Sequence, residues 1–468
     1  MGRKKSLPVL EKVLITDIGS EGNAIARVDN MVVFVPMLVP GDIVDIRVIR
    51  KRKRYMEGTA IHFHTYSSLR QDPTCEHFGI CGGCKWQHLP YTEQLKWKEQ
   101  QVRDNLRRIG HIDIPELNPI IGSDDKFFYR NKLEYTFSDK RWLTKEEIST
   151  GAEIEKGSAL GFHIPGLFDK VLNIDYCHLQ PEPTNAIRNA VRVYSVEKGL
   201  EFYNLREHTG FLRNLVVRNT ISGEVMVVVV FAREDRERRE ELLNFIKDTF
   251  PRVTSLMYMI NGKKNDSTGD IDALPYYGND HIIETMEGLK FRIGPKSFYQ
   301  TSTRQGARLY SIVKDFASLK GGEVVYDLYT GTGTIACYLA SAASKVIGIE
   351  YVSEAVEDAR NNALMNNIEN TFFFAGDMKD VLCEQFFSEN GRPDVLVTDP
   401  PRAGMHEDVI GAIIRSAPSK IVYVSCNPAT QARDLGLLDQ YYLIKEVQPV
   451  DMFPHTHHVE NVVLLNRR

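Results

Sequence analysis

The segment EVVYDLYTGTGTIA, residues Glu323–Ala336, decides the fold of this chain. Its pattern predicts a buried strand, a glycine turn and the start of a helix, because Gly331 and Gly333 allow a tight bend beside the helix N-terminus. From about Leu289 onward, predicted strands and helices alternate strictly, which indicates a mostly parallel, doubly wound α/β sheet. We therefore expect a Rossmann-like domain over residues 289–468.

The rest of the 468 residues is long enough for two further domains. Residues 9–64 alternate short apolar runs with Gly, Asp and Asn turns, which predicts a small OB-like β-barrel of about five strands. Farther along, apolar strand candidates alternate with polar turns and a helix, so a mixed α/β domain follows. We place the three domains at 1–68, 69–288 and 289–468. An amphipathic helix expected over 91–110 could pack on the last of them.

Composition narrows the class of protein. Hydrophobic residues make up 43% and charged residues 26% of the chain, which excludes a disordered or collagen-like protein. The most apolar run, Val225–Ala232, is far shorter than the roughly 20 residues that a membrane span needs. The start MGRKKSLPVL is basic but leads into no apolar stretch typical of a secretion signal. We expect a soluble, cytoplasmic monomer with no membrane contact and no obligate protein partner.

Charge is spread unevenly, although the net charge is only −4. Residues 1–110 hold 18 Lys and Arg against 12 Asp and Glu, and the remainder holds 40 against 50. A basic front portion suits a polyanionic partner; the alternative is an ordinary solvated face. The densest cluster of basic residues in this front portion should lie at a turn of the barrel and contact nucleic-acid phosphates. This basic run consists of Arg50, Lys51, Arg52, Lys53 and Arg54.

The glycine loop also predicts a ligand, because Gly331 and Gly333 leave room beside the helix. The spacing G-x-G-x-x-A matches the fingerprint of dinucleotide-binding proteins, so a nicotinamide-dependent oxidoreductase is one interpretation. Asp327, which enters the loop, would oppose a pyrophosphate and favours a cationic ligand such as S-adenosylmethionine. Glu350 ends the next strand, where it can accept both ribose hydroxyls, and Asp377 after the following strand suits the adenine edge.

Two further strand ends hold a candidate ligand-binding residue and a candidate catalytic residue. The run DVLVTDPPR, residues 394–402, places Asp399 at the carboxyl edge of the sheet, where ligands bind in such folds. Arg402 stands where amino-directed nucleic-acid methyltransferases usually have an aromatic residue, which argues against an exocyclic amine as acceptor. The next strand, IVYVSCNP, places Cys426 at the same edge. A lone cysteine at a strand end is more often a small core residue, but this one neighbours the loop and Asp399.

We interpret Cys426 as a nucleophile. Carbon 5 of uracil is a poor nucleophile, but a thiolate that adds to carbon 6 makes carbon 5 able to attack a sulfonium methyl group. A base must then remove the carbon 5 proton before the thiol leaves. Glu460, in the run HHVENV, is the candidate base. A non-catalytic RNA-binding module on the same scaffold is an alternative interpretation.

Four motifs in order make the chain resemble the RNA uridine-C5 methyltransferase family. They are SFYQT at 297–301, DPPR at 399–402, SCNP at 425–428 and HVE at 458–460. More particularly, the chain is similar to the iron–sulfur branch, which has an N-terminal TRAM barrel and makes 5-methyluridine in 23S ribosomal RNA. The resemblance likewise implies a cysteine nucleophile and a glutamate proton acceptor. The contacts to S-adenosylmethionine that it implies are Gln300, Tyr329, Glu350 and Asp399, with Thr334 and Asp377 in lesser roles.

Two positions depart from the family pattern. Ser302 stands where the family often has Asn, which puts any contact made by that amide in question. Thr330 stands where the cofactor loop commonly has Cys, and this should change little because Cys426 supplies the nucleophile. The transfer-RNA branch of the family shares the catalytic core, so tRNA is the less favoured alternative substrate.

Four of the seven cysteines resemble a metal site. Cys75, Cys81 and Cys84 lie close together, and Cys177 follows much later. Four thiolates hold either zinc or an iron–sulfur cluster. Three clustered cysteines with a distant fourth resemble a ferredoxin-like arrangement, and Gly82–Gly83 would let backbone amides approach cluster sulfurs. The family resemblance also implies a [4Fe–4S] cluster, so we expect iron–sulfur rather than zinc, in a structural role.

The segment Tyr129–Lys132 is a second candidate for RNA contact. It offers an aromatic ring beside two cations and resembles the family's RNA-contacting strand, although it could also be an ordinary strand edge at the surface. A uridine buried in folded RNA must be unstacked before a thiol can reach its ring, so such contacts are needed. We expect Arg130, Asn131 and Lys132 to contact RNA.

Overall fold

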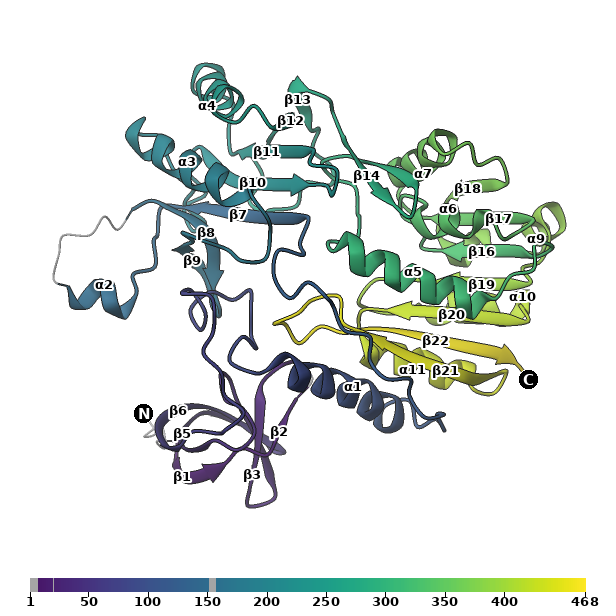
Figure 1. Cartoon of the computed structure of the whole chain (residues 1–468), viewed down its shortest axis with the longest axis horizontal. Helices are drawn as coiled ribbons and strands as arrows, with labels where there is room; N and C mark the ends of the chain where they lie inside the picture. Colours follow the sequence, from purple (N-terminus) through teal and green to yellow (C-terminus); the bar gives the residue numbers. More distant parts are fainter. Residues whose placement is uncertain (1–6, 20, 151–156) are drawn as a thin grey trace.

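The computed structural model describes residues 7–19, 21–150 and 157–468, and it contains three large β-sheets (Figure 1). A six-stranded sheet forms the N-terminal barrel, and two seven-stranded sheets follow. The predicted α/β class with an N-terminal barrel is therefore confirmed. Residues 1–6 and 20, which the expected barrel included, lie outside the described residues.

The N-terminal sheet curls around a small apolar core. Its strands are β1 (Val9–Leu14), β2 (Asp17–Ile18), β3 (Ala24–Val28), β4 (Met31–Val35), β5 (Ile43–Lys51) and β6 (Tyr55–Thr65). Alternate residues of β5 point inward, so Val44, Ile46 and Val48 are buried in this core. The strand order is β1-β5-β6-β4-β3-β2. The sequence predicted about five strands, and the sixth is the two-residue β2.

The central sheet is covered on both faces. Its region contains β7 (Lys132–Ser138), α2 (Lys145–Ser149), β8 (Ala159–Ile164), β9 (Leu167–Asn173), α3 (Thr184–Glu197), β10 (Leu212–Asn219), β11 (Val225–Phe231), α4 (Arg236–Thr249), β12 (Val253–Ile260) and β13 (Leu274–Gly278). Every residue of β10 and β11 is buried, which explains the long apolar run of β11. Leu215 and Val227 pack with α3 and α4, whereas Val216 and Val228 join the core of the C-terminal domain. The two sheets therefore share one continuous core.

The C-terminal sheet is parallel on one side and antiparallel on the other. Its region contains β14 (Ile282–Met286), β15 (Leu289–Ile293), α5 (Thr303–Ala317), β16 (Val324–Leu328), α6 (Thr334–Ala340), β17 (Lys345–Glu350), α7 (Ser353–Met365), β18 (Thr371–Ala375), α8 (Met378–Val381), α9 (Glu384–Asn390), β19 (Val395–Thr398), α10 (Glu407–Ser416), β20 (Lys420–Ser425), α11 (Pro428–Leu438), β21 (Tyr442–Val450) and β22 (Glu460–Arg467). The strand order is β18-β17-β16-β19-β20-β22-β21, and the first five strands are parallel.

The prediction that strands and helices alternate strictly is wrong at both ends of this region. Strands β21 and β22 pair antiparallel and are joined directly by residues 451–459, and β22 is inserted beside β20. Strands β14 and β15 also form an antiparallel hairpin, and the boundary expected at 288/289 falls inside its turn. Both pairs place strand next to strand because antiparallel neighbours need no helical crossover.

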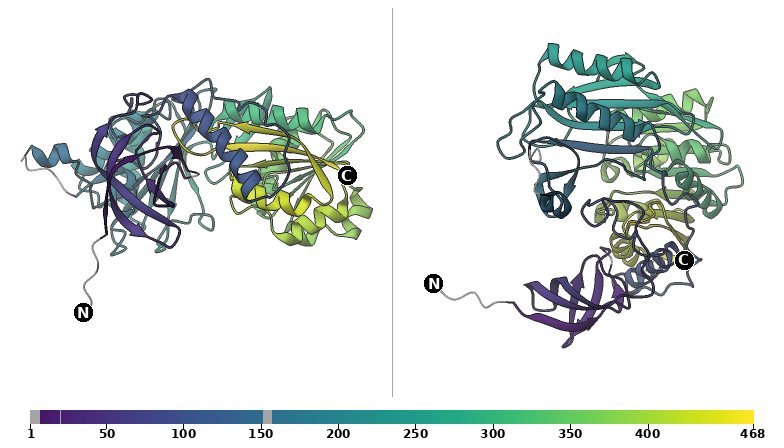
Figure 2. Two further views of the ribbon diagram at one scale, coloured as in Figure 1. Left: turned by 90° about the horizontal axis from the view of Figure 1, so that it is seen from below. Right: turned by 60° about the vertical axis from the view of Figure 1, so that its left-hand side comes forward.

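Helix α1 (Tyr91–Arg108) lies against the C-terminal domain, although it follows the barrel in sequence (Figures 1 and 2). Val102 and Leu106 join the core that contains residues of α11 and β21. A Cβ added at Gly436 of α11 would lie 3.0 Å from the carbonyl oxygen of Gly110, so glycine allows the two backbones to approach closely. The helix ends two residues before the expected Gly110.

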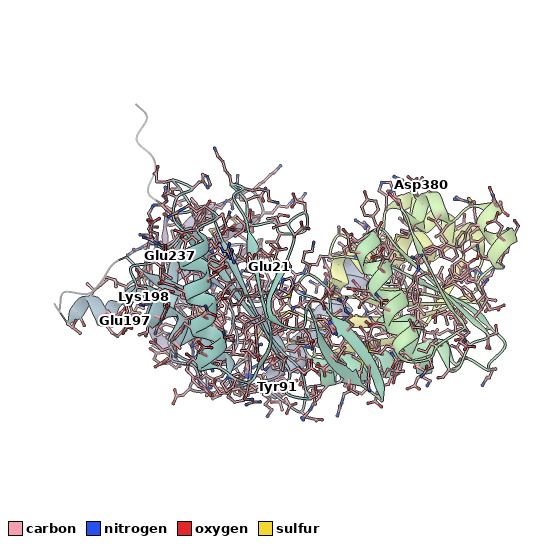
Figure 3. The ribbon with its side chains drawn as sticks, turned by 90° about the horizontal axis from the view of Figure 1, so that it is seen from above. Glu21, Tyr91, Glu197, Lys198, Glu237 and Asp380 are labelled. Atoms are coloured by element: carbon pink, nitrogen blue, oxygen red, sulfur yellow. The ribbon has the colours of Figure 1, made fainter. Side chains whose placement is uncertain are left out.

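Figure 3 shows the same arrangement from above, with side chains. Glu197 and Lys198, at the end of α3, lie on the central part of the molecule, and Asp380 lies at the upper edge of the C-terminal part in this view. Tyr91, which begins α1, lies between them in this view. Among the described helices, none is both long and apolar enough to cross a membrane.

Candidate active site

The glycine loop between β16 and α6 bends as the sequence predicted. Gly331 and Gly333 have positive φ angles of 54° and 76°. A Cβ added at Gly333 would lie 2.8 Å from the Cβ of Ala359, so only glycine fits there. A Cβ added at Gly331 would meet no described atom within 4 Å. The loop is therefore tight on its helix side and open on the other side, where a ligand could lie.

Three of the predicted cofactor residues gather around this loop. Glu350, at the end of β17, accepts hydrogen bonds from the backbone amide of Gly331 at 3.1 Å and of Val352 at 3.0 Å. Burial raises the pKa of Tyr329 to about 12, and the charges of Asp377 and Glu350 add to this shift. The strand ends therefore bring these side chains to one place, as the parallel sheet requires.

Two of the predicted residues with lesser roles already have protein partners. The hydroxyl of Thr334, the first residue of α6, lies 3.3 Å from that of Thr332. Asp377 accepts a hydrogen bond from the backbone amide of Lys379 at 3.2 Å and pairs with the Lys379 ammonium at 3.3 Å. A ligand at the adenine position would therefore share Asp377 with Lys379.

Asp327 lies fully buried beneath the loop. The Thr330 hydroxyl donates to its Oδ2 at 2.5 Å, and the backbone amide of Ala336 also lies beside this carboxyl group. Burial raises the pKa of Asp327 to about 7. A buried carboxyl group is a place where a cationic ligand nearby would be stabilised. The donor and acceptor set at this loop therefore fits S-adenosylmethionine, which is cationic and carries no phosphate.

Gln300 lies on the segment that leads into α5 and is almost fully buried. Its backbone carbonyl accepts a hydrogen bond from the side chain of Asn131 at 2.8 Å. Its own side chain lies against the hydroxyl of Tyr310, and the charge of Asp399 also acts on that hydroxyl. The glutamine of the SFYQT motif therefore lies near the predicted catalytic residues.

Strand pairing brings the two predicted catalytic residues together. Cys426 directly follows β20, and Glu460 begins β22, which runs antiparallel to β20. Ser425 pairs with Asn461. Because the strands are antiparallel, the residue after Ser425, Cys426, lies beside the residue before Asn461, Glu460. Asp399 directly follows β19, which borders β20 on its other side. The edge of the sheet therefore holds a thiol between two carboxyl groups.

The pKa values of all three groups are raised, chiefly by burial. Burial raises the pKa of Cys426 to about 11, and the charges of Glu460 and Asp399 add to this effect. Burial raises the pKa of Glu460 to about 8, again with a contribution from Asp399. Burial and the charge of Asp327 raise the pKa of Asp399 to about 7. Two carboxyl groups that titrate near neutral pH beside a thiol form a site suited to proton transfer.

Arg402 supplies positive charge to this site, a role that the sequence did not reveal. Its charge lowers the pKa of both Cys426 and Glu460 and so opposes the effect of burial. Its backbone carbonyl accepts hydrogen bonds from the side chains of Asn427 at 3.0 Å and Thr430 at 3.2 Å. The turn of the DPPR motif is thereby tied to the turn that holds Cys426. The two prolines indicated a rigid turn, but not the position of the guanidinium group.

Sequence reasoning also missed the contact between α1 and the segment 451–459, which leads into Glu460. Lys98 and Asp451 form a fully buried ion pair with 2.6 Å between Nζ and Oδ1. Lys98 stands four residues before Val102 and therefore lies on the apolar face of the helix. A lysine on that face was the available signal, because buried lysines almost always have a charged partner.

The four predicted metal-ligating cysteines line one cavity of about 140 Å³. Burial raises the pKa of each thiol, to about 12 for Cys81 and Cys84. The backbone amide of Gly83 donates to the sulfur of Cys81 at 3.4 Å, as expected for an amide that approaches a metal-bound sulfur. The cavity brings together Cys75, Cys81, Cys84 and Cys177.

No three of the four sulfurs lie within 4.8 Å of one another. Among the described residues, three or more metal-ligand atoms come that close only at Glu76, His77 and Asp175. The His77 ring already accepts a hydrogen bond from the Asp175 amide at 3.0 Å. A tetrahedral zinc site with bonds of about 2.3 Å would place its sulfurs only about 3.8 Å apart.

The predicted RNA-binding residues fall into two groups. The run Arg50–Arg54 is exposed at the turn between β5 and β6, where Arg50 pairs with Glu57 at 3.3 Å. Arg130 is half-buried, and its guanidinium group lies 6.0 Å from the ring centroid of Tyr129 and 5.3 Å from that of Phe453. Arg130 also lines the four-cysteine cavity. It therefore lies between that cavity and the segment 451–459.

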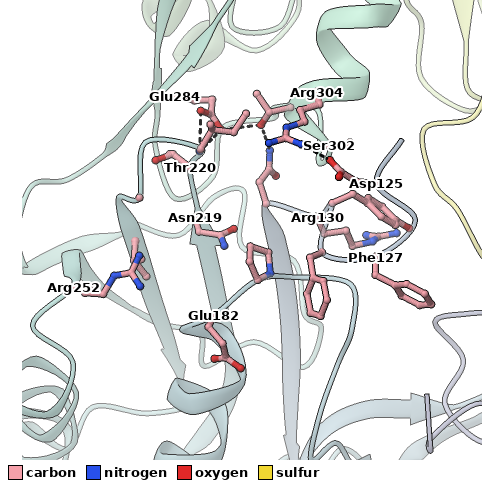
Figure 4. A pocket seen from close by; sticks show the side chains of 18 residues that line it. Asp125, Phe127, Arg130, Glu182, Asn219, Thr220, Arg252, Glu284, Ser302 and Arg304 are labelled. Atoms are coloured by element: carbon pink, nitrogen blue, oxygen red, sulfur yellow. Dashed lines mark hydrogen bonds and ion pairs between the residues drawn. The ribbon is translucent and has the colours of Figure 1, made fainter. Parts of the chain in front are cut away.

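The two residues after Arg130 have contacts inside the protein. The side chain of Asn131 donates to the Thr303 hydroxyl at 3.0 Å, in addition to the Gln300 carbonyl. Burial and the neighbouring Arg218 lower the pKa of Lys132. A pocket of about 440 Å³ opens beside them, where Figure 4 shows residues of the central domain and of the start of α5 facing one another. The residues labelled there include Phe127, Arg130, Glu284, Ser302 and Arg304.

Comparison with known proteins agrees with this geometry. A model of the tRNA (Uracil-5-)-methyltransferase family matches residues 215–468, and a model of the TRAM domain matches residues 11–61. An uncharacterized RNA methyltransferase of Bacteroides thetaiotaomicron is 57% identical over 454 residues, which cover 96% of this chain and 100% of that protein. An uncharacterized RNA methyltransferase of Porphyromonas gingivalis is 55% identical over 462 residues, 97% of this chain and 99% of that protein.

A solved structure is similar over almost the same length of the chain. Pyrococcus abyssi tRNA (uracil-54, C5)-methyltransferase, in complex with S-adenosyl-L-homocysteine, is 28% identical and has a TM-score of 0.74, covering 97% of this chain and 100% of that chain. These matches favour a methyltransferase over the nicotinamide-dependent oxidoreductase that the glycine loop also suggested. They likewise favour an enzyme over a non-catalytic RNA-binding module. The chain therefore belongs to the tRNA (uracil-5-)-methyltransferase family and is an S-adenosylmethionine-dependent RNA methyltransferase.

Proposed function

We propose that this protein methylates carbon 5 of a specific uridine in 23S ribosomal RNA and thereby makes 5-methyluridine. The observation that carries the proposal is the strand register that sets Cys426 beside Glu460, with Asp399 on the neighbouring strand. A thiol at such a position can add to a pyrimidine ring, and a carboxylate beside it can accept a proton from that ring.

Cys426 acts as the nucleophile. Because its pKa is raised to about 11, the thiol must lose its proton as it attacks, and the ionised form of Asp399 can receive this proton. The sulfur then forms a bond to carbon 6, and the electron pair of the carbon 5–carbon 6 double bond moves towards carbon 5 and the adjacent carbonyl. S-adenosylmethionine, when bound, supplies a methyl group activated by its sulfonium charge.

Glu460 acts as the base that completes the reaction. Once carbon 5 carries the methyl group, Glu460 removes the carbon 5 proton, and the freed electron pair restores the double bond. The bond between sulfur and carbon 6 then breaks, and Cys426 recovers its proton from Asp399. A pKa raised to about 8 makes the ionised Glu460 a stronger base than an exposed glutamate.

The cofactor would be held around the glycine loop. Its open side at Gly331 leaves space for a ligand, Glu350 lies at its rim, and the buried Asp327 favours positive charge. The residues that we propose to contact the cofactor are Gln300, Tyr329, Gly331, Gly333, Thr334, Glu350, Asp377 and Asp399.

The four-cysteine cavity would hold a [4Fe–4S] cluster. Its volume of about 140 Å³ is far larger than a single zinc ion needs, and sulfurs of which no three lie within 4.8 Å of one another suit a cluster better than one ion. Such a cluster would join the loop at Cys75–Cys84 to Cys177 on the central domain. Methyl transfer needs no electron transfer, so its role would be structural: it would fix Arg130 against the segment that leads into Glu460.

RNA would be bound by the barrel, 1–68, and the central domain, 69–288, while 289–468 performs the chemistry. The exposed basic run Arg50–Arg54 would contact phosphates, and Arg130 would lie closer to the target uridine. Asn131 and Lys132 would then act mainly through the contacts that hold the Gln300 segment. We infer that the enzyme acts as a cytoplasmic monomer.

A transfer RNA is the second candidate substrate. It is favoured by the likeness to the Pyrococcus abyssi enzyme, whose described substrate position is uracil 54 of tRNA. The resemblance of the four cysteines to the iron–sulfur branch favours ribosomal RNA, whereas the barrel does not discriminate, because the likeness to the tRNA enzyme covers 97% of this chain. Mapping 5-methyluridine in total RNA from cells with and without this gene distinguishes the two. Loss of the base from 23S ribosomal RNA would support the first candidate, loss from tRNA the second, and an unchanged map would contradict both.

A further inference from the structure

A stacked pair of aromatic rings lies on the barrel, at the opposite end of β6 from the basic run. The rings of Phe63 and Tyr66 have centroids 4.6 Å apart and planes inclined by 14°. Tyr66 is 66% exposed, so one side of the stack faces solvent. Strand β6 has 11 residues, so at about 3.3 Å per residue the chain between the two features spans at most roughly 36 Å. This strand length is several times the Debye length of about 8 Å in physiological salt, so their contributions to binding can be separated.

Arg70 holds the stack in place. Its guanidinium carbon lies 5.2 Å from the ring centroid of Phe63 and 5.7 Å from that of Tyr66. Two of its nitrogens donate to the two oxygens of Asp42 at 2.8 and 2.7 Å, and Asp42 is fully buried. The bidentate geometry fixes the plane of the guanidinium group. The aromatic surface is therefore ordered before any ligand arrives, which lowers the entropic cost of binding.

Tyr66 also lines a cavity of about 550 Å³ between the barrel and the four-cysteine loop. His88 lines the same cavity and is only 4% exposed. The Leu38 backbone lies beside it, yet neither ring nitrogen has a partner in hydrogen-bonding geometry within the described residues. Burial lowers the pKa of His88 to about 4, so the ring is neutral, with one donor and one acceptor. The cavity is lined by Met37, Tyr66, Arg70, Gln71, Asp72, Pro73, Phe78 and His88.

We propose that this cavity binds one unpaired base of the RNA substrate, which stacks on Tyr66 and turns a polar edge towards His88. The inference rests on the proposed RNA methylation and adds a nucleotide-binding subsite away from the catalytic edge. A base fits because it has an apolar face for the stack together with donors and acceptors at its edge for a neutral histidine. The volume lies within the range of about 300–1,000 Å³ found for small-ligand pockets.

The test compares Tyr66→Ala and Tyr66→Phe in the full-length protein. The probe is a fluorescein-labelled, unstructured single-stranded RNA, and an RNA duplex of the same length serves as the second probe. Loss of one stacked base should raise the Kd of Tyr66→Ala for the single strand by about five-fold to about a hundred-fold. Tyr66→Phe keeps the stacking ring and should stay within about twofold of the unaltered protein. The salt dependence of binding should not change, because stacking releases no counterions.

Tyr441→Ala is the matched control, because Tyr441 is 47% exposed and precedes β21 in the C-terminal domain. It should bind both RNA probes normally, and all variants should keep their melting temperature and S-adenosylmethionine affinity. An unchanged Kd for Tyr66→Ala, an equal loss in Tyr66→Phe, or an equal loss on the duplex would overturn the subsite. Failure of the proposed function looks different, because the unaltered protein would then make no 5-methyluridine in RNA.

Discussion

Raising the pH from about 6 to about 9 should speed removal of the carbon 5 proton in proportion to the ionised fraction of Glu460. Burial and the nearby Asp399 raise the pKa of Glu460 to about 8, so its carboxyl is about one-tenth ionised near pH 7 and about nine-tenths ionised near pH 9. The rate should therefore rise about tenfold per pH unit at the acidic end and level off above about pH 8. The direction is upward because only the ionised carboxylate accepts a proton.

The assay is a single-turnover reaction with RNA that carries tritium on carbon 5 of its uridines, in which release of tritium into water reports proton removal. Glu460→Gln keeps the size of the side chain but cannot accept the proton. It should lose the rise with pH and accumulate a denaturant-resistant protein–RNA adduct, and Cys426→Ala should form no adduct. A flat profile across this range, or a rise centred near the ordinary glutamate pKa of about 4.3, would refute the reasoning. A rise that continues to about pH 11 would assign the titration to Cys426 instead.

Three further outcomes are expected. Arg52→Glu combined with Lys53→Glu should weaken RNA binding and reduce the slope of log K against log salt by about 2, because each lost phosphate contact removes about 0.9. The affinity for S-adenosylmethionine should not change and serves as the control. Unchanged RNA affinity would exclude phosphate contact by the basic run. Protein purified in air should be brown, with broad absorbance near roughly 400 nm that Cys177→Ser loses, whereas colourless protein with stoichiometric zinc would exclude the cluster. Lys98→Met should lower the free energy of unfolding by about 3–5 kcal/mol in chemical denaturation, because it leaves the charge of Asp451 buried and unpaired. Adding Asp451→Asn should recover part of that loss, and a single variant as stable as the unaltered protein would contradict the importance of the pair.

The glycine loop and most of the catalytic edge could be predicted because they follow from local rules. A strand followed by two glycines and a helix has few possible geometries, and the observed φ angles of Gly331 and Gly333 agree with it. In a parallel sheet the carboxyl ends of neighbouring strands meet at one edge. Glu350, Asp399 and Cys426 each follow or end such a strand, so their proximity could be inferred from order alone.

Contacts made between distant segments could not be predicted in this way. The pairing of Ser425 with Asn461 depends on an antiparallel strand inserted beside β20, and no local pattern fixes that register. Asn131 stands between two cations in sequence, which suggested RNA contact, yet its amide group is turned towards the Gln300 carbonyl. The charge of Arg402 on Cys426 likewise depends on tertiary structure, because the two residues belong to different strand ends.

The buried ion pair between Lys98 and Asp451 joins positions 353 residues apart. It therefore limits where a hybrid protein, made from this sequence and that of a relative, can change from one parent to the other. A hybrid joined near residue 288 would take its lysine from one parent and its aspartate from the other. A junction placed before Cys75 keeps both partners in one parental half, together with all four cysteines that line the cavity. The front barrel is thus the exchangeable module, and helix α1 is inherited with the catalytic half.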